Sequence, residues 1–391
     1  MRKVLKWAVR VGVLLIILAA AIGLWKREEI MRLLAVNSLF DADRIVSNFS
    51  NMDRAFIHKD IPTDGSEPSA LPSGPSLVMP PEYEDWVKDR TVTATLVLQN
   101  GQIVHEAYYQ GTAQDDLRIS WSMAKSYLSA LFGILVDEGA IGSLDEQVTA
   151  YAPKLAGGAY DGATIRNVLQ MTSGVTFDED YLDYDSDINK MGRVLALGRE
   201  MDAFAAALTE TFAPAGETWK YTSIDTHVVG MVARGATGRD IPDLMAEKLI
   251  GPLGLEKQPY YLTDGVGVAF VLGGLNITVR DYARFGQMIL QNGAWQGQQI
   301  VPADWVAAST QPSAPTKPGK VGYGYQWWVP VGATPGQFMG RGIYGQYLYI
   351  DQPAGIVIVV TAADRQFREN GVNRGNIDMF RQIVEAANGT R

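Results

Sequence analysis

The chain of 391 residues contains no cysteine, which excludes disulfide bonds, thiolate zinc sites and a cysteine nucleophile. Histidine is scarce as well, because only His58, His105 and His227 occur and none of them forms an H-E-x-x-H pair. We therefore expect no metal site and no cofactor. A G-x-S-x-G elbow, the usual anchor of an α/β-hydrolase triad, is also missing. A nucleophilic serine in this chain would need a base other than histidine.

Positive charge is scarce in most of the chain. Residues 1–34 hold seven basic and two acidic residues, whereas the remainder holds 27 basic and 41 acidic residues. An acidic body argues against a nucleic-acid partner, which requires a basic surface. The composition, 47% hydrophobic and 20% charged, is typical of a globular protein with one large domain or two smaller ones.

An apolar run of 15 residues, Val11–Trp25, follows a basic N-terminus. A cleaved signal peptide would have such a basic start and an apolar run of about 7–15 residues, with Ala19–Ala21 as its small-residue site. The run continues past that site, however, and a helix from Trp7 to Trp25 would be about 27 Å long, close to the thickness of a hydrocarbon core. We therefore expect residues 1–27 to be a single-pass inner-membrane anchor with the body on the periplasmic side. Secretion after signal cleavage is the alternative.

The rest of the chain divides into a connector and a folded body. Residues 28–81 are charged at first and then rich in proline and serine, which is typical of a linker. The body, residues 82–391, begins and ends with strand patterns that enclose a long helical stretch over about residues 140–290. The expected strands and closing helix are a hairpin over 91–109 that turns at Asn100-Gly101, a second hairpin over 338–360 and a helix over 371–388. This order predicts an α+β fold, in which helices flank an antiparallel β-sheet and a helical domain is inserted.

Ser122 and Lys125 form an S-x-x-K pair at the start of an expected helix, which apolar residues at helical spacing extend to about Gly139. Residues three apart on a helix point to the same side, so a neutral lysine amine could accept the proton of the serine hydroxyl. The helix N-terminus would also place a positive dipole where an oxyanion forms. The alternative is a serine N-cap followed by a surface lysine.

Two later segments could complete such a site. Tyr221 could carry a proton to a leaving group, since a lysine nearby would lower the pKa of its phenol, or it could be an ordinary half-buried tyrosine. The glycines of residues 340–346 lie on an expected strand. Glycine inside a strand marks a close approach of the backbone, here by a ligand, or else a bulge or an edge strand.

Together these pieces resemble the serine β-lactamase and penicillin-binding-protein superfamily, in its class C β-lactamase-like branch. Ser122-x-x-Lys125 matches the first motif of that branch. Tyr221-Thr222-Ser223 matches the second, with serine in place of asparagine. The segment Gly342–Gln346 stands where the third motif, K-T-G, belongs. The likeness covers roughly residues 82–388, and it includes Leu169–Val175, Gly273–Asp281 and Tyr323–Trp328.

The resemblance implies a role for each matching residue. Ser122 would be the acylated nucleophile and Lys125 the neutral base that activates it. Tyr221 would protonate the leaving group and activate the deacylating water. The backbone N–H groups of Ser122 and Gln346 would form the oxyanion hole. Four further residues would face the substrate: Ser223, Ile343, Tyr344 and Gly345.

Two departures from the family pattern bear on the substrate. Many penicillin-recognising members begin the third motif with lysine or histidine, where this chain has Ile343, and Ser223 lacks the amide of the usual asparagine. Arg341 could supply a cation, but strand alternation points it away. The pattern is most similar to the 6-aminohexanoate-dimer hydrolase and carboxylesterase relatives. In those relatives a tyrosine and acidic residues of a loop contact an amide or an ammonium group, and Tyr181 is the matching tyrosine.

The loop around Tyr181 is strongly acidic, which indicates either recognition of a cationic substrate or simply a solvated loop. We expect a serine hydrolase that cleaves a small-molecule ester or linear amide, similar to a 6-aminohexanoate oligomer, through an acyl-enzyme. The alternatives are a penicillin-binding protein with D-Ala-D-Ala carboxypeptidase or β-lactamase activity, and an inactive membrane-anchored binding module. The pattern carries no information on the oligomeric state.

Overall fold

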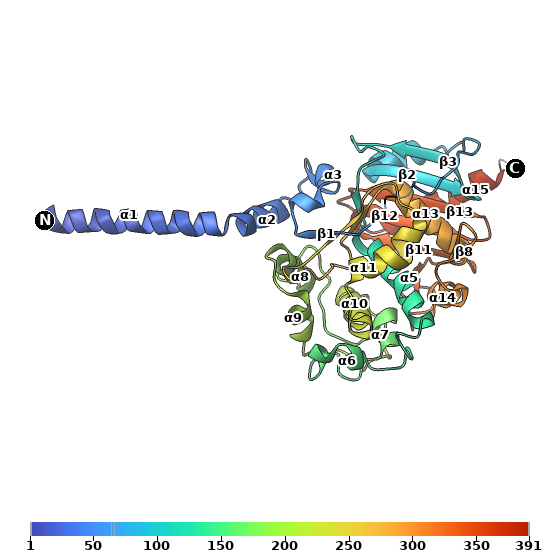
Figure 1. Ribbon diagram of the computed structural model, residues 1–391. Coiled ribbons are helices and arrows are strands. Elements are labelled where there is room, and N and C mark those ends of the chain that lie inside the picture. The colour runs from blue at the N-terminus through green and yellow to red at the C-terminus, as the bar shows by residue number, and fades with distance from the viewer. Residues whose placement is uncertain (1, 64, 66, 390–391) are drawn as a thin grey trace.

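A seven-stranded antiparallel sheet forms the centre of the body, with the strand order β3-β2-β13-β12-β11-β10-β9 (Figure 1). The structure is a computed structural model, and it describes residues 2–63, 65 and 67–389. The strands of this sheet are β2 (Val92–Gln99), β3 (Gln102–Tyr108), β9 (Gly322–Tyr323), β10 (Trp328–Val329), β11 (Gln337–Gly342), β12 (Gln346–Asp351) and β13 (Ile356–Ala362). The predicted hairpin over 91–109 is confirmed as β2 and β3, which turn at Asn100 and Gly101 with φ values of 49° and 80°.

Side chains of the central strands alternate between two apolar layers. In β12, Tyr347 and Tyr349 point toward one layer, while Leu348 and Ile350 point toward the other. The first layer is covered by α4 (Tyr83–Asp89) and α15 (Val372–Gly389), and the second by α5 (Ala124–Asp137) and α13 (Val279–Leu290). This two-residue alternation buries both faces of the sheet, and it confirms the predicted α+β fold with flanking helices.

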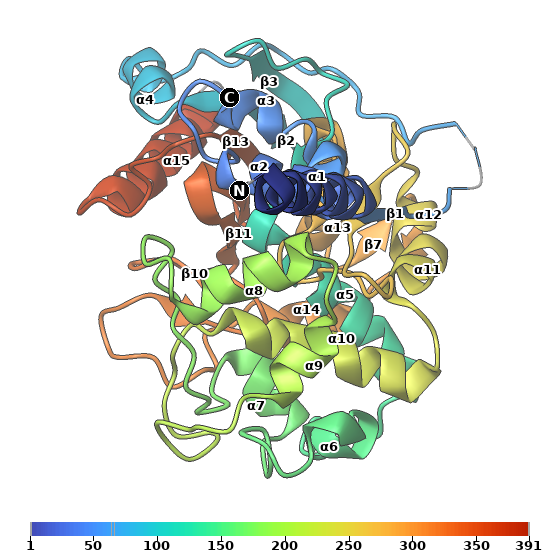
Figure 2. The ribbon, with the colours of Figure 1, turned by 90° about the vertical axis from the view of Figure 1, so that its left-hand side faces the viewer.

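Short helices gather on one side of the sheet, with the buried helix α10 among them (Figure 2). They are α6 (Val148–Tyr151), η3 (Pro153–Leu155), α7 (Ile165–Gln170), α8 (Asp187–Ala196), α9 (Met201–Ala206), α10 (Ser223–Thr237), α11 (Ile241–Met245), η4 (Ala246–Ile250) and α12 (Gly251–Leu253). The remaining elements after α10 are β5 (Tyr260–Leu262), β6 (Leu275–Ile277), β7 (Ala294–Trp295), β8 (Gln298–Gln299) and α14 (Ala303–Ser309). Strands β5 and β6 belong to a second sheet with the order β1-β5-β6-β4.

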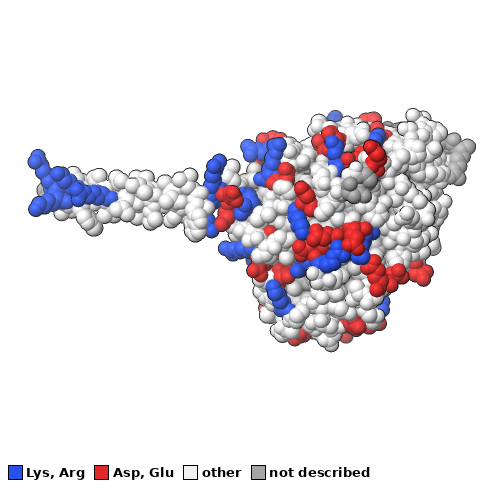
Figure 3. Space-filling model, viewed as in Figure 1, with Lys and Arg blue, Asp and Glu red and all other residues white. Residues whose placement is uncertain are grey.

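The N-terminal helix α1 (Arg2–Trp25) projects away from the body (Figure 1). Its most apolar 18-residue window has a mean hydropathy of 2.3 and none of it is buried, so it is long and apolar enough to cross a membrane or to serve as a signal sequence. Its basic residues gather at the far end, and the shaft is uncharged up to the junction with α2 (Arg27–Asn37) (Figure 3).

Much of the segment between α1 and the sheet packs onto the body, which its composition did not indicate. Leu39, Phe49 and Ile61 are buried in the main core, and β1 (His58–Asp60) pairs with β5. The other elements of this part are α3 (Ile45–Asn48) and η1 (Met52–Arg54). Phe49 of this segment packs on the nearby Phe40 and also on Trp121 and Tyr344, which lie far along the chain. The division of the chain at residues 27 and 81 stays a prediction.

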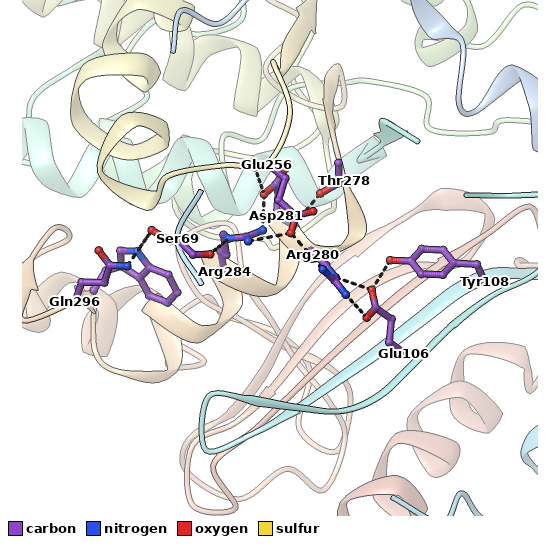
Figure 4. A network of polar contacts seen from close by, with 10 residues as sticks. Ser69, Glu106, Tyr108, Glu256, Thr278, Arg280, Asp281, Arg284 and Gln296 are labelled. Atoms are coloured by element: carbon purple, nitrogen blue, oxygen red, sulfur yellow. Dashed lines mark hydrogen bonds and ion pairs between the residues drawn. The ribbon is translucent and has the colours of Figure 1, made fainter. Parts of the chain in front are cut away.

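A buried ion-pair network fixes the proline-rich stretch to α13 (Figure 4). The Arg284 guanidinium donates to the Ser69 backbone oxygen at 2.8 Å, to Asp281 at 2.8 Å and to Glu256 at 3.0 Å. One turn earlier, Arg280 donates two hydrogen bonds to the Glu106 carboxylate of β3, at 2.8 and 2.7 Å. The network therefore joins the linker, α13 and the sheet.

Candidate active site

Ser122 lies on a 3-10 turn, η2 (Trp121–Met123), between the short strand β4 (Arg118–Ile119) and α5. The residue before it, Trp121, has a φ of 42°, in the left-handed region, which costs a bulky residue roughly 1–2 kcal/mol. Aromatic packing holds Trp121 there, with ring centroids 5.9 Å from Phe40 and 5.5 Å from Phe49. The position of Ser122 is thus set by an aromatic cluster behind it.

Lys125 is the second residue of α5 and its side chain is buried. Its Nζ donates a hydrogen bond to the backbone oxygen of Leu272 at 2.8 Å, which fixes the position of the amine. Burial lowers the pKa of Lys125 to about 7, although the negative charges of Glu179 and Asp225 oppose this shift. A large share of the amine is therefore neutral near pH 7 and able to accept a proton.

Tyr221 connects the serine to the lysine. A side-chain hydrogen bond joins the Ser122 hydroxyl and the Tyr221 phenol, and Lys125 Nζ lies 5.6 Å from the centroid of the Tyr221 ring. The ring stacks on Trp328 at a centroid distance of 4.9 Å. The expectation of a lowered pKa for this phenol is wrong: burial raises the pKa of Tyr221, and the hydrogen bond with Ser122 offsets only part of that shift.

The third segment joins β11 to β12 through the turn η5 (Ile343–Gly345). A Cβ atom at Gly342 would lie 2.8 Å from the backbone oxygen of Ser120, so β11 runs directly against the turn that carries Ser122. The close approach expected from these glycines is thus made by the backbone of the protein. The buried Gln346 side chain holds the turn by donating to the backbone oxygens of Ile343 at 3.1 Å and Ala362 at 2.8 Å.

Two cavities meet at Ser122, and Tyr181 and Ile343 line both of them. The smaller has a volume of about 230 Å³ and includes Tyr221, and the larger has a volume of about 330 Å³ and includes Ser223 and Tyr344. Gly345 and Gln346 are not among the described residues that line these two cavities. Gly345 has a φ of 87°, and a Cβ atom there would lie 2.9 Å from Ala362 Cβ. A side chain at this position of the turn would therefore collide with Ala362.

Glu179 is a residue of the site that the sequence analysis did not single out. Its carboxylate accepts hydrogen bonds from the Ser223 backbone N–H, and from the Tyr181 hydroxyl at 2.9 Å. Burial raises the pKa of Glu179. Neighbouring acids point elsewhere: Asp180, for example, pairs with Arg368 at 2.7 Å. Glu179 falls in an every-second-residue pattern with Phe177 and Tyr181, and this pattern could have singled it out. Treating the acidic run as a whole conceals the pattern.

Two further charged residues, Arg341 and Asp225, lie near the site. Arg341 lines the smaller cavity, with its guanidinium 5.4 Å from the centroid of the Trp328 ring, although strand alternation had indicated that it points away. Asp225 is fully buried and accepts hydrogen bonds from the hydroxyls of Tyr160 at 2.8 Å and Ser173 at 2.7 Å. Burial raises the pKa of Asp225 to about 7. Nothing in the spacing of Asp225 indicated a place near Lys125.

A serine, a partly neutral lysine and a tyrosine that meet in this way on an α+β fold are characteristic of serine hydrolases of the β-lactamase type. The chain belongs to the beta-lactamase family, which it matches over residues 85–378. It is 31% identical over 293 residues to the 6-aminohexanoate-dimer hydrolase of Paenarthrobacter ureafaciens, a stretch that covers 71% of this chain and 74% of that protein. The family and this relative establish that the chain is a serine hydrolase of the amidase or esterase kind, as predicted.

Solved structures share the fold. A Bacillus anthracis protein assigned as a 6-aminohexanoate-dimer hydrolase superimposes with a TM-score of 0.78 at 23% identity, covering 88% of this chain and 95% of that one. A family VIII carboxylesterase superimposes with a TM-score of 0.57 at 17% identity, covering 79% of this chain and 98% of that one. At these identities the two likenesses show the fold alone.

Proposed function

We propose that this chain hydrolyses an ester or a linear amide through an acyl-enzyme on Ser122, with Lys125 as the base. The observation that carries the proposal is the position of Tyr221, which is hydrogen-bonded to Ser122 while the centroid of its ring lies 5.6 Å from the Lys125 amine. Because the raised pKa of Tyr221 keeps its phenol protonated, the neutral Lys125 amine is the acceptor for the proton that leaves the serine hydroxyl. The lowered pKa of Lys125 makes its neutral amine available at pH 7.

In the acylation step, Ser122 Oγ forms a bond to the carbonyl carbon of the substrate as its proton passes to Lys125. The Ser122 N–H stabilises the oxyanion, while Gln346, which lines neither cavity, holds the adjacent turn through its side chain. The bond from that carbon to the leaving oxygen or nitrogen then breaks, Tyr221 supplies the proton that the leaving group takes, and the protonated Lys125 amine returns a proton to Tyr221. Water attacks the acyl-enzyme in the same geometry and regenerates Ser122. Ser223, Ile343 and Tyr344 surround the substrate, while Gly345 supports the turn beneath it.

The relative from Paenarthrobacter ureafaciens is named for hydrolysis of a 6-aminohexanoate dimer, which favours a linear amide or an ester of similar shape. In this chain Tyr181 and Glu179 face the smaller cavity, where either could contact the polar part of a substrate.

A substrate panel on serine variants tests the proposal. Ser122→Ala should abolish turnover of p-nitrophenyl esters and linear amides, and Lys125→Ala should nearly abolish it. Ser129→Ala is the matched control, because Ser129 lies on the same helix but donates to the backbone oxygen of Tyr325 at 2.7 Å and lines neither cavity. Full activity in Ser122→Ala would refute the assignment.

A penicillin-recognising activity is the second candidate, and the position of Arg341 favours it. Arg341 lines the smaller cavity, where its guanidinium could meet a substrate carboxylate in place of the missing third-motif lysine, whereas Arg368 of the same cavity is paired with Asp180. Turnover of nitrocefin that is lost in Arg341→Gln would support this candidate. Absence of nitrocefin turnover alongside rapid ester hydrolysis would exclude it.

We also propose that α1 anchors the enzyme in the inner membrane as a single span, with the body in the periplasm. The basic residues at the far end of α1 support an N-terminus inside the cell. The proposed units are the anchor over residues 1–27, a connector over 28–81 and the hydrolase domain over 82–391 with its helical insertion at about 140–290.

A further inference from the structure

The larger cavity beside Ser122 is enclosed by parts of the chain that lie far apart in sequence. One wall comes from the end of α2 and the turn after it, a second wall from α8, which contacts α2, and a third part from the region of β5 and β6. The apolar residues of the two walls are Val36, Leu39, Phe40, Ile188, Met191 and Leu195. At about 330 Å³ the cavity is in the size range of small-molecule sites.

The two cavities differ in the charged side chains that line them, while apolar surface prevails in both. Among the described residues that line the larger cavity, Arg193 is the one charged side chain, and its guanidinium is held at the rim, 4.0 Å from the centroid of the Tyr184 ring. The smaller cavity is lined by Glu179, Arg341 and Arg368. A group in the larger cavity is therefore recognised by burial of apolar surface, and a group in the smaller cavity by charge and hydrogen bonds.

The position of Tyr221 orients a substrate across these cavities. Ser122 lines both, so the bond that breaks lies at their junction. Tyr221 lines only the smaller cavity, and the group that protonates a leaving group must stand on the leaving-group side. The leaving group therefore occupies the smaller cavity with its charged side chains, and the acyl group occupies the larger, apolar cavity.

The larger cavity also lies on the side of the body from which α1 projects. Helix α2, which forms one wall, follows α1 directly, and its Arg32 side chain donates to the backbone oxygen of Ala196 at the end of α8 at 3.0 Å. Both α2 and α8 lie on the side of the body from which α1 projects (Figures 1 and 2). Apolar side chains are exposed on this side, including Leu34 of α2 (58%) and Leu182 of the loop before α8 (82%). With α1 in a bilayer, these residues face its surface.

We infer that the acyl substrate is a long-chain aliphatic ester or amide taken from the membrane surface. Its acyl chain lies between α2 and α8, and its polar head lies in the smaller cavity. This inference rests on the proposed acyl-enzyme on Ser122. In the reaction Ser122 Oγ bonds to the carbonyl carbon, the head leaves with a proton, and water then releases a free fatty acid.

The inference predicts a strong dependence on chain length. Each methylene buried in the cavity should raise kcat/KM up to about fourfold until the cavity is filled. The test uses the full-length chain in phosphatidylcholine nanodiscs, with p-nitrophenyl butyrate and p-nitrophenyl dodecanoate as substrates. The quantity compared is the ratio of kcat/KM for dodecanoate to that for butyrate, because this ratio does not depend on the fraction of enzyme that is folded.

Gly192 offers a direct way to fill the cavity. It lies on α8, lines the larger cavity, and a Cβ atom there would meet no heavy atom within 4 Å. Gly192→Phe should lower the dodecanoate-to-butyrate ratio at least tenfold from a wild-type value above ten. Gly375→Phe on α15 is the matched control, because it has equally open surroundings and lines neither cavity, and it should leave the ratio unchanged.

A wild-type enzyme that prefers butyrate, or a ratio that Gly192→Phe does not change, would overturn the inference. Ser122→Ala separates this failure from that of the proposed function. If Ser122→Ala abolishes hydrolysis of both esters but the wild type shows no preference for the long chain, only the inference about the substrate fails. If Ser122→Ala still hydrolyses both esters, the acyl-enzyme itself is wrong and the substrate inference falls with it.

Discussion

At the scale of single residues, the chemistry depends on burial of one amine. Lys125 has no neighbouring cation among the charged groups that shift its pKa; desolvation lowers that pKa, and Glu179 and Asp225 only reduce the effect. The reactive form is the neutral amine, so kcat/KM should rise with pH through about 7.

Removing the charge of Glu179 should move this rise to lower pH. The Glu179 carboxylate raises the pKa of Lys125, so Glu179→Gln should lower it while keeping one of the two oxygens that accept from Ser223 and Tyr181. The pH profile of kcat/KM for a p-nitrophenyl ester measures the shift. The control is Asp183→Asn, an exposed acid of the same loop that accepts from the Asp185 backbone N–H. An ascending limb that stays in place or moves to higher pH in Glu179→Gln would contradict this account.

The buried lysine should also reduce stability. Its pKa is lowered from 10.5 in the unfolded chain to about 7 in the folded one, so the cost to the folded state grows as pH falls from 10.5 to 7 and is constant below 7. Lys125→Met should raise the free energy of unfolding at pH 7 by about 2 kcal/mol, less than the full penalty because the Leu272 carbonyl loses a hydrogen bond. Urea denaturation at pH 7 and pH 10.5 should show a gain that shrinks at the higher pH. A variant less stable than wild type at pH 7 would contradict this expectation.

The residues that the sequence could reveal are those with a fixed spacing or order. Ser122 and Lys125 lie one helical turn apart, and Tyr221 stands in a recognisable tripeptide. Glu179 and Asp225 have no such spacing, because tertiary packing brings them to Lys125 from distant parts of the chain. The Arg341 side chain is directed toward the cavity while its guanidinium packs on the Trp328 ring. Strand alternation alone does not predict this orientation.

At the scale of elements, the contact between β11 and the Ser122 turn leaves no space for a side chain at Gly342. A Cβ atom there would lie 2.8 Å from the Ser120 oxygen and 3.0 Å from Trp121 Cβ. Gly342→Ala should therefore push β11 away from Ser122, lower kcat by roughly 100-fold and cost about 1–3 kcal/mol of stability. Gly375→Ala, an open helical position in α15, should keep full activity and be slightly more stable. Wild-type kcat in Gly342→Ala would show that the contact does not position the nucleophile.

Elements with local signals were predictable, and elements held by distant partners were not. The β2–β3 hairpin has an Asn-Gly turn between alternating strands, and α7 starts with Thr164, whose side chain accepts from the Asn167 N–H. By contrast, β1 has three residues and pairs with β5 some 200 positions later, so no local pattern marks it.

At the scale of the whole molecule, the helix proposed as an anchor is tied to the site. Phe40, which follows α2, stacks on Tyr344 at a centroid distance of 4.7 Å, and Tyr344 belongs to the turn beside Ser122. The arrangement keeps the apolar cavity at the side from which α1 projects (Figure 1).

Membrane attachment can be checked on the full-length chain. An epitope placed at the N-terminus should remain on the mature protein, and the protein should stay in the membrane pellet after an alkaline carbonate wash, because the apolar window of α1 has a mean hydropathy of 2.3. Loss of the epitope from an otherwise intact soluble enzyme would show instead that α1 is a cleaved signal sequence.

The central claim is that Ser122 forms the acyl-enzyme, and peptide mass spectrometry after brief exposure to a fluorophosphonate probe tests it most directly. The account predicts one stoichiometric adduct on Ser122, none in Ser122→Ala, and slow labelling in Lys125→Met because the base is missing. An adduct on another serine, together with ester turnover that persists in Ser122→Ala, would contradict it.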